Sequence, residues 1–105
     1  MRKIINGKRY NTATATNVCD VSPSGYFSND FRWEDTYLYR TSRGNWFLAG
    51  KGGPLTRWAQ KSGDTGRCSG SGIIPIDADE ARSLLEQHGL SGQVEEYFGE
   101  TLEDA

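Results

Sequence analysis

The stretch EDTYLYRTSRGNWFLAGKGG, residues 34–53, decides the fold of this 105-residue chain. Two segments rich in aromatic and aliphatic residues, 36–41 and 45–49, flank a short polar turn that contains Gly44. Aromatic and β-branched side chains favour the pleated, half-buried surface of a strand, so this pattern predicts a β-hairpin. We expect the inward side chains of this hairpin to form the centre of the core.

Both faces of the predicted hairpin carry apolar side chains. Successive residues of a strand point to opposite faces. Tyr37 and Tyr39 therefore lie on one face of the first strand, opposite Leu38, and Trp46 lies opposite Phe47 in the second. We expect a helix over one face and a loop, aromatic side chains or a partner over the other.

The N-terminal segment predicts a second hairpin. Asn6-Gly7 supplies the two positive-φ positions of a type I′ turn, whose twist matches that of the flanking strands. After it, the spacing of apolar residues over 12–19 predicts a short helical turn with Thr12 as its cap. The Ser-, Pro- and Gly-containing residues 22–25 predict a loop.

The residues after the central hairpin predict a short helix, a loop and an edge strand. Pro54 is preorganised for a first helical position, and apolar residues recur at helical spacing over 55–59. Residues 62–72 contain four glycines and predict a mobile loop. Residues 73–76 predict a strand that its proline confines to an edge or a terminus.

The C-terminal residues predict helices. Asp77 can cap a helix, with Glu80 at the third helical position of a capping box and Gly89 at its end. Its inward stripe is Ala81, Leu84, Leu85 and His88. A final helical turn capped by Ser91 presents Val94, Tyr97 and Phe98 to the core.

Together the elements predict an α+β fold, a small antiparallel sheet packed by two or three short helices. It forms one domain over residues 1–99, with a frayed acidic tail at 100–105.

Composition limits the function classes. Apolar stretches reach only three or four residues, so we expect no membrane span and no signal peptide, and hence a cytoplasmic protein. In a reducing compartment Cys19 and Cys68 are expected as free thiols, with one disulfide as the alternative. With His88 as the single histidine there are too few ligands for zinc, and no cofactor is expected.

The charge distribution divides the chain. The first 72 residues carry eleven Lys and Arg against five Asp and Glu, a net charge of +6. Residues 73–105 carry one arginine against nine acids, a net charge of −8. Because charged surfaces attract oppositely charged molecules, this separation of charge influences which partners the protein can bind. It also predicts that Arg40, Arg43 and Lys51 of the central hairpin hold the acidic helices electrostatically.

Two candidate binding surfaces follow from these charges. Acids on the C-terminal helices can imitate a run of phosphates and bind a partner protein, although a solvated helix face explains them equally well. These acids are Asp79, Glu80, Glu86, Glu95 and Glu96.

Basic residues interleaved with aromatic ones can bind single-stranded nucleic acid, whose bases stack on the rings, although core packing of the aromatics is the alternative. The basic residues are Arg32, Arg40, Arg43, Lys51, Arg57 and Lys61, and the aromatic ones Trp33, Tyr39, Trp46 and Trp58.

No motif predicts an enzyme. Residues 50–56, GKGGPLT, resemble a phosphate-binding loop only superficially, because the lysine precedes the last glycines and Pro54 lacks a donor. A tight turn explains them better, with anion binding at the start of a helix as the alternative. His88 is expected to be structural, and Cys68 has no base beside it in the sequence.

The segments KIINGKRYNT (3–12), YLYRTSRGNWFLAGKGGP (37–54) and IIP (73–75), followed by Glu80-Ala81, occur in an order that resembles a group of small bacterial proteins. Those proteins are encoded in phage, plasmid and other mobile-element neighbourhoods. The resemblance covers most of residues 3–99 and brings no catalytic motif. It implies a non-enzymatic protein that binds and inhibits a host protein or complex, as anti-CRISPR and other counter-defence inhibitors do. The alternative is a nucleic-acid-binding accessory protein that uses the basic residues of the first 72 positions.

Overall fold

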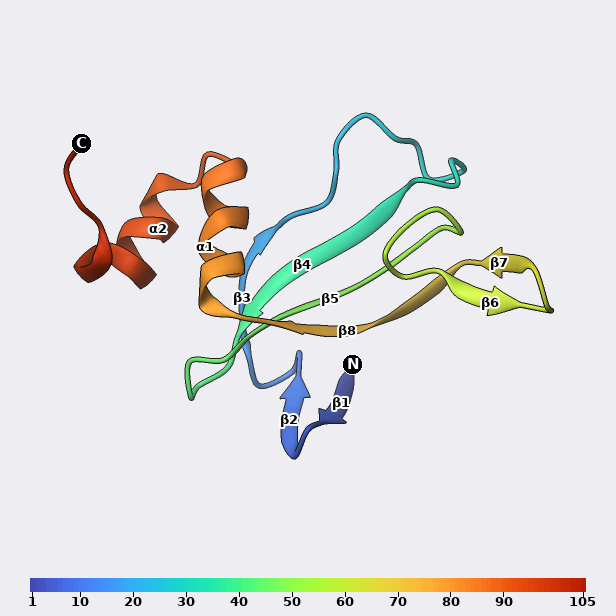
Figure 1. Cartoon of the computed structure of the whole chain (residues 1–105), viewed down its shortest axis with the longest axis horizontal. Coiled ribbons are helices and arrows are strands. Elements are labelled where there is room, and N and C mark those ends of the chain that lie inside the picture. Colours follow the sequence, from blue (N-terminus) through green and yellow to red (C-terminus); the bar gives the residue numbers. More distant parts are fainter.

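A four-stranded antiparallel sheet forms the centre of the computed structural model, which describes residues 1–105 (Figure 1). The strand order is β3-β4-β5-β8, with β3 at Thr16–Asp20, β4 at Glu34–Arg40, β5 at Trp46–Gly52 and β8 at Gly70–Ile76. Two hairpins stand apart from this sheet: β1 (Arg2–Ile5) with β2 (Lys8–Asn11), and β6 (Gln60–Ser62) with β7 (Gly66–Cys68). The chain ends in α1 (Ala78–Gln87), α2 (Ser91–Phe98) and the 3₁₀ helix η1 (Gly99–Thr101). The predicted α+β class is confirmed.

The predicted central hairpin is β4–β5. Its seven residue pairs run from Glu34 opposite Gly52 to Arg40 opposite Trp46. Gly44 turns the chain between them with a φ of 86°, in the left-handed region that favours glycine. The strands are longer than predicted because the glycines at the end of β5 still pair with β4.

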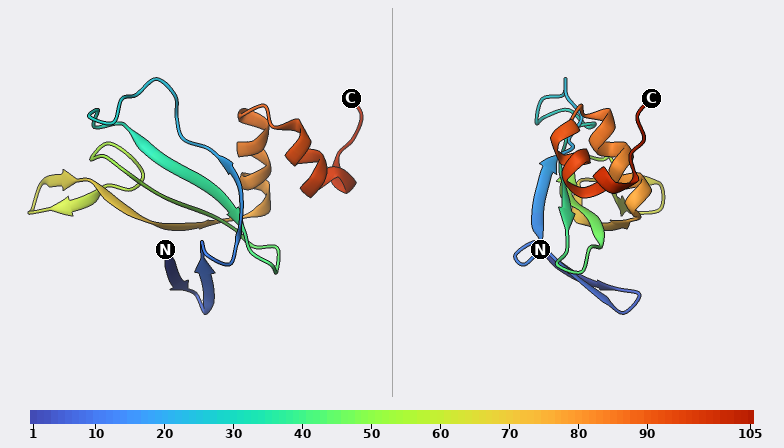
Figure 2. Two further views of the ribbon diagram at one scale, coloured as in Figure 1. Left: turned by 180° about the vertical axis from the view of Figure 1, so that it is seen from behind. Right: turned by 90° about the vertical axis from the view of Figure 1, so that its left-hand side faces the viewer.

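The two faces of the sheet have separate cores, as the alternation predicted. On one face, Leu38 of β4 packs in a buried cluster with Ala81 and Leu85 of α1 and with Val94 of α2. The two helices lie together at one end of the sheet, which Figure 2 shows from two further directions. The buried residues of the other face are Tyr10, Phe47, Ala49 and Ile73.

The N-terminal hairpin β1–β2 contributes to this second face. Asn6 and Gly7 have φ values of 50° and 76°, which confirms the predicted turn. Tyr10 of β2 is buried against the Phe47 ring in a T-shaped arrangement, with centroids 5.4 Å apart. Tyr39 stacks on the same ring at 5.1 Å. A hairpin and aromatic side chains therefore cover the face opposite the helices.

The ends of α1 are as predicted. The Asp77 carboxylate accepts from the Glu80 N–H at 2.8 Å, and Gly89 reverses the chain with a φ of 67°. The Leu90 N–H donates to the Leu85 carbonyl at 3.0 Å, which is the long bond of a Schellman motif. The inward position of His88 is wrong. It is the C-cap residue, where the chain has left helical geometry, and its side chain is exposed.

The helical turn predicted over 12–19 is wrong beyond its first residues. The Ala15 N–H donates to the Asn11 carbonyl at 3.0 Å, which closes a single turn. The chain then enters β3, whose pairing with β4 contains an irregularity between Asn17 and Cys19. Threonine and valine are stiff at χ1 and suit a strand, and β3 completes the open side of β4.

The short helix predicted over 54–59 is also absent. The Thr56 hydroxyl donates to the Gly53 carbonyl at 2.8 Å and accepts from the Trp58 N–H at 3.2 Å. A side chain that bonds to nearby backbone groups competes with helical hydrogen bonding. The segment is therefore a series of turns, and it buries Trp58 while leaving Leu55 exposed.

The loop predicted over 62–72 is instead the β6–β7 hairpin followed by the start of β8. Gly63 forms the turn with a φ of 71°, and all side chains of the two short strands are exposed. Backbone pairing without apolar burial defines this hairpin. The edge strand predicted at 73–76 is confirmed, because β8 pairs only with β5, and it begins earlier, at Gly70.

Candidate functional site

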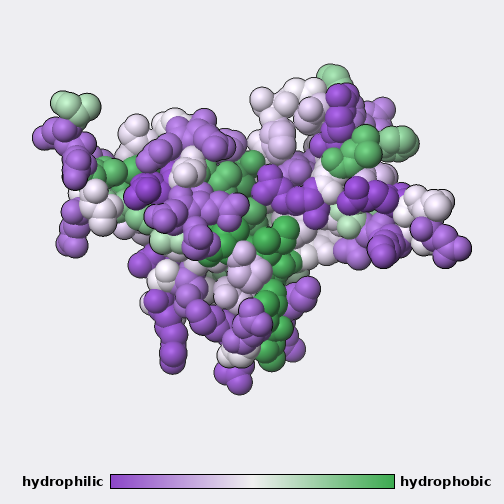
Figure 3. All heavy atoms as spheres, in the orientation of Figure 1, coloured by the Kyte–Doolittle hydropathy of each residue, from purple (hydrophilic) through white to green (hydrophobic).

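The five predicted acids lie exposed on the two packed helices. On α1, Asp79 and Glu86 are seven residues apart, which places them on one side, opposite the buried Ala81 and Leu85. Arg82 lies near both carboxylates, at 3.7 Å from Asp79 and 3.6 Å from Glu86. Figure 3 shows hydrophilic side chains over this end of the molecule. We call these exposed carboxylates of α1 and α2 together the acidic face; they are Asp79, Glu80, Glu86, Glu95 and Glu96.

The inner sides of the helices are held by apolar and aromatic contacts. The Trp46 ring packs edge-on to Tyr97 at 5.2 Å and stacks on Phe98 at 5.5 Å. The Arg40 guanidinium lies 5.4 Å from the Tyr97 ring and 5.7 Å from that of Trp46. None of the four ion pairs joins the central hairpin to the helices. The predicted electrostatic hold is thus made only by Arg40, and through aromatic rings rather than carboxylates.

The six predicted basic residues do not gather on one surface. Arg57 pairs with Glu34 at 2.9 Å, and Arg32 pairs with Asp30 at 2.9 Å, while Arg40 lies on the aromatic rings described above. The other three are exposed on separate elements: Arg43 in the β4–β5 turn, Lys51 on β5 and Lys61 on β6. Half of the predicted nucleic-acid surface is therefore bound within the chain.

The aromatic residues of that surface lie mainly in the core. Trp46 and Trp58 are buried, and Tyr39 is half-buried against Phe47. Trp33 is also half-buried. Core packing, the alternative considered from the sequence, accounts for Trp46, Trp58 and Tyr39, whereas Trp33 belongs to neither core cluster.

The Asp30–Arg32 pair has an electrostatic effect at the surface. The Arg32 guanidinium donates to both Asp30 oxygens, at 3.0 and 2.9 Å, and the Arg32 backbone N–H donates at 2.8 Å. These hydrogen bonds, with the side-chain bonds as the larger cause, lower the pKa of Asp30 to about 2. Arg32 also lies over the Tyr26 ring at 4.6 Å.

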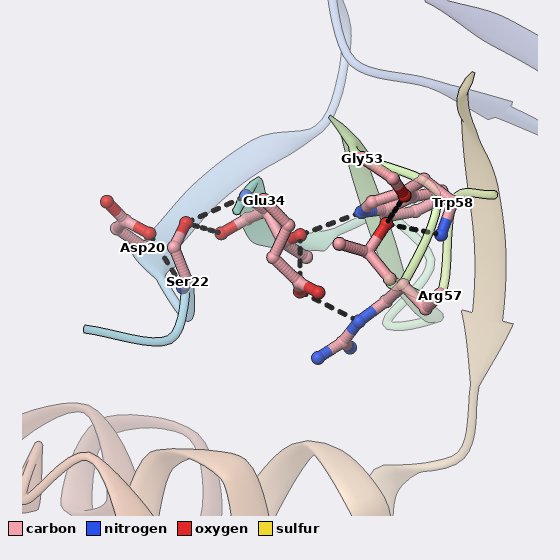
Figure 4. A network of polar contacts seen from close by, with 8 residues as sticks. Asp20, Ser22, Glu34, Gly53, Arg57 and Trp58 are labelled. Carbon is pink, nitrogen blue, oxygen red and sulfur yellow. Dashed lines mark hydrogen bonds and ion pairs between the residues drawn. The ribbon is translucent and has the colours of Figure 1, made fainter. Parts of the chain in front are cut away.

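A buried polar network attaches residues 53–58 to β4 (Figure 4). The Glu34 carboxylate accepts from the Thr36 hydroxyl at 2.9 Å and pairs with the Arg57 Nε at 2.9 Å. The Thr36 hydroxyl in turn accepts from the Trp58 indole N–H at 2.8 Å. Every buried side-chain nitrogen and oxygen has a hydrogen-bond partner. The network therefore explains how an irregular segment is fixed to the sheet.

Ser22 extends the network toward β3. Its hydroxyl accepts from the Thr36 N–H at 2.8 Å and donates to the Thr36 carbonyl at 3.3 Å. The Ser22 N–H donates to the Asp20 carboxylate at 2.8 Å. The loop that leaves β3 is thus fastened to β4 at the point where strand pairing stops.

The residues with reactive side chains lie apart. His88 is exposed at the end of α1, Cys68 is exposed on β7, and both cysteines are free thiols. Partial burial, and then the charge of Asp20, raise the pKa of Cys19. No three His, Cys, Asp or Glu side chains come together as a metal-binding group. No helix has the length and apolar character needed to cross a membrane.

The Gly-rich residues 50–53 end β5 and lead into turns. No helix follows Pro54, so the anion site considered at a helix start has no helix behind it. A Cβ at Gly53 would lie 2.5 Å from the Phe31 carbonyl oxygen, so this glycine is needed for close backbone approach.

Sequence reasoning did not identify one group of exposed apolar residues. Phe27 is 82% exposed, Phe31 66% and Leu55 63%, although large apolar side chains are usually buried. The Leu55 N–H donates to the Phe31 carbonyl at 2.9 Å, which places these two residues side by side. Exposed apolar groups of this kind are typical of contact surfaces. The only signal was the presence of these aromatics within a Ser-, Asn- and Asp-containing segment.

Comparisons of the chain with protein-family models, with curated proteins and with solved structures gave no match. The resemblance to small proteins of mobile elements therefore stays a prediction.

Proposed function

We propose that this protein is a non-enzymatic inhibitor that binds a basic surface of a host protein or complex through its acidic face. The observation that carries the proposal is the exposure of five acids on two helices whose inner sides are fixed to the sheet. These acids take no part in holding the sheet, because only Arg82 forms ion pairs with them. They are therefore free to pair with cations of a partner.

The chemistry of such a partner follows from the acids. Carboxylates spaced along packed helices present a fixed array of negative charge, as a nucleic-acid backbone does. A protein that binds nucleic acid displays a complementary basic surface, and occupying that surface blocks its normal ligand. Together with the mobile-element context that the resemblance implies, this supports a counter-defence inhibitor, with anti-CRISPR activity as the candidate. Nucleic-acid binding by the six basic residues is the weaker candidate, because three of them already have partners within the chain.

A pull-down from host lysate, with and without nuclease, tests the proposal. We expect the tagged protein to recover a host protein that stays bound after nuclease treatment and is released by high salt, since the contacts are between charges. The combined variant Asp79→Asn, Glu86→Gln, Glu95→Gln and Glu96→Gln should lose this protein. The matched control is Asp64→Asn, which removes an exposed acid from the β6–β7 turn and should change nothing.

Two results would contradict the proposal. One is recovery of nucleic acid alone. The other is equal recovery of the host protein by the combined acid variant. If recovery is lost instead in the double variant Phe27→Ser and Phe31→Ser, the exposed aromatic residues form the binding surface and the acidic face does not.

A further inference from the structure

A cleft of about 540 Å³ separates the β1–β2 hairpin from the β4–β5 turn. Lys8, Arg9 and Asn11 line it from the hairpin, and Ser42 and Arg43 line it from the turn. Only two of its eleven lining residues are hydrophobic, and none is an acid. The cleft is thus polar and basic, and none of its lining residues belongs to the two helices that carry the acidic face.

The three cations of the cleft have no counter-charge. Lys8, Arg9 and Arg43 belong to none of the four ion pairs of the molecule. The Lys8 ammonium donates only to the Asn45 side-chain oxygen, at 3.3 Å. Positive charges gathered in one concave site reinforce each other's potential and attract anions. The other polar side chains that line the cleft can donate hydrogen bonds to the same anion.

The walls of the cleft are fixed before any ligand binds. On the hairpin side, Tyr10 is buried against Phe47, which fastens β2 to the sheet. On the turn side, the Thr41 N–H donates to the Asn45 carbonyl at 2.8 Å, and the Asn45 N–H donates to the Thr41 hydroxyl at 3.0 Å. A preformed site loses less entropy on binding than one that must be ordered.

The size and the donors of the cleft together define a class of ligand. Its volume falls within the range of about 300–1,000 Å³ that is usual for small-molecule sites. An arginine side chain can form two parallel hydrogen bonds to phosphate, and lysine adds a compact charge. We propose that the cleft between the β1–β2 hairpin and the β4–β5 turn binds a phosphoryl group, carried either by a free nucleotide or by a nucleic-acid backbone.

Nuclear magnetic resonance titration of the ¹⁵N-labelled protein tests this, with ADP and a 5′-phosphorylated oligothymidine as separate probes. We expect saturable shifts of the backbone amides of residues 7–11 and 41–45. Arg9→Gln and Arg43→Gln should each weaken binding about tenfold, which is the effect expected of one charge-assisted contact. Arg43→Lys should also weaken it, because lysine keeps the charge but lacks the paired donors. Arg9 and Arg43 are both exposed, so unchanged spectra elsewhere in the sheet will show that the fold of each variant is intact.

The control is the pair Lys61→Gln and Arg67→Gln, two exposed cations that lie opposite each other in the β6–β7 hairpin. Affinity should stay within about twofold in this variant.

Saturable binding of ADP that the oligothymidine does not exceed assigns a free nucleotide. Tighter, salt-sensitive binding of the oligothymidine at the same amides assigns a backbone. Absence of saturable shifts with both probes, or an equal loss in the control, overturns the proposal. Neither result depends on the acidic face, so this inference and the proposed function can fail separately.

Discussion

One face of the central sheet is covered in two different ways along its length. At one end α1 lies on it, and Leu38 and Leu85 belong to the same apolar cluster, in which both side chains are fully buried. At the other end residues 53–58 lie on it, and Thr36 meets Trp58 through a hydrogen bond. A helix satisfies its own backbone and can present a purely apolar side, whereas an irregular segment needs side chains to satisfy it. The two ends should therefore respond differently to mutation.

The largest effect is expected at the helix end. Leu85→Ala should lower the free energy of unfolding by about 2–5 kcal/mol, because it removes buried methyl groups and leaves a cavity. Urea denaturation followed by circular dichroism measures this loss. Leu84→Ala, at a half-buried position of the same helix, should cost clearly less. Equal losses at the two positions would mean that α1 does not pack as described.

The network end should lose stability through unpaired polar groups. Thr36→Val keeps the shape of the side chain but leaves the Trp58 indole N–H without its acceptor and removes one of the two donors to Glu34, which keeps its pair with Arg57. The free energy of unfolding should fall by about 1–3 kcal/mol. Thr36→Ser retains the hydroxyl and should recover most of the loss in the same denaturation experiment. A valine variant as stable as the wild type would show that the hydrogen bonds contribute nothing net.

A smaller effect separates charge from apolar packing at the helix end. Arg40→Gln should cost about 0.5–1 kcal/mol, because the guanidinium loses its position beside the Tyr97 and Trp46 rings. Arg43→Gln, in the exposed turn beyond it, removes the same charge without such contacts and should be neutral. If both substitutions cost the same, the contribution of Arg40 is general charge rather than contact with the rings.

The smallest effect lies in the loop that leads to the network end. Arg32→Gln should raise the pKa of Asp30 from about 2 toward the ordinary value of 3.8. Because the folded-state pKa of Asp30 is the lower one, the pair stabilises the fold above pH 3.8 and loses this effect as the pH falls toward 2. Carboxyl resonances followed from pH 5 to pH 1.5 measure the midpoint. An unchanged midpoint in the variant would exclude Arg32 as the cause.

Most of the helix end was predictable from sequence, and the network end was not. Two predictions at the helix end were wrong: His88 is exposed, and α2 has Leu90 rather than Ser91 as its N-cap residue. The capping residue Asp77, the closing Gly89 and the helical spacing of Ala81 and Leu85 are local signals, and all were confirmed. The 53–58 segment was mistaken for a helix because its conformation depends on the bond between Trp58 and Thr36, 22 positions apart. Local spacing carries no information about such a bond.

The same distinction between local signals and long-range contacts applies to the candidate binding surfaces. The exposure of Asp79 and Glu86 follows from helical periodicity once the buried side of α1 is known. The engagement of Arg57 depends on Glu34, a distant residue that tertiary folding brings to it. The basic cleft was equally hidden, because it forms only when the N-terminal hairpin docks beside the β4–β5 turn.

The two outer strands of the sheet have a consequence for how a partner can bind. β3 carries an irregular register between Asn17 and Cys19, and β8 carries Pro75, which has no N–H. Proline is tolerated in a paired strand where its missing donor faces away from the neighbour, so Pro75 removes a donor from the open edge. Such interruptions oppose edge-to-edge addition of a further strand, whether it comes from another copy or from an extended peptide. The addition of a partner's strand is therefore disfavoured at both edges of the sheet, and we expect any partner to bind through side-chain contacts.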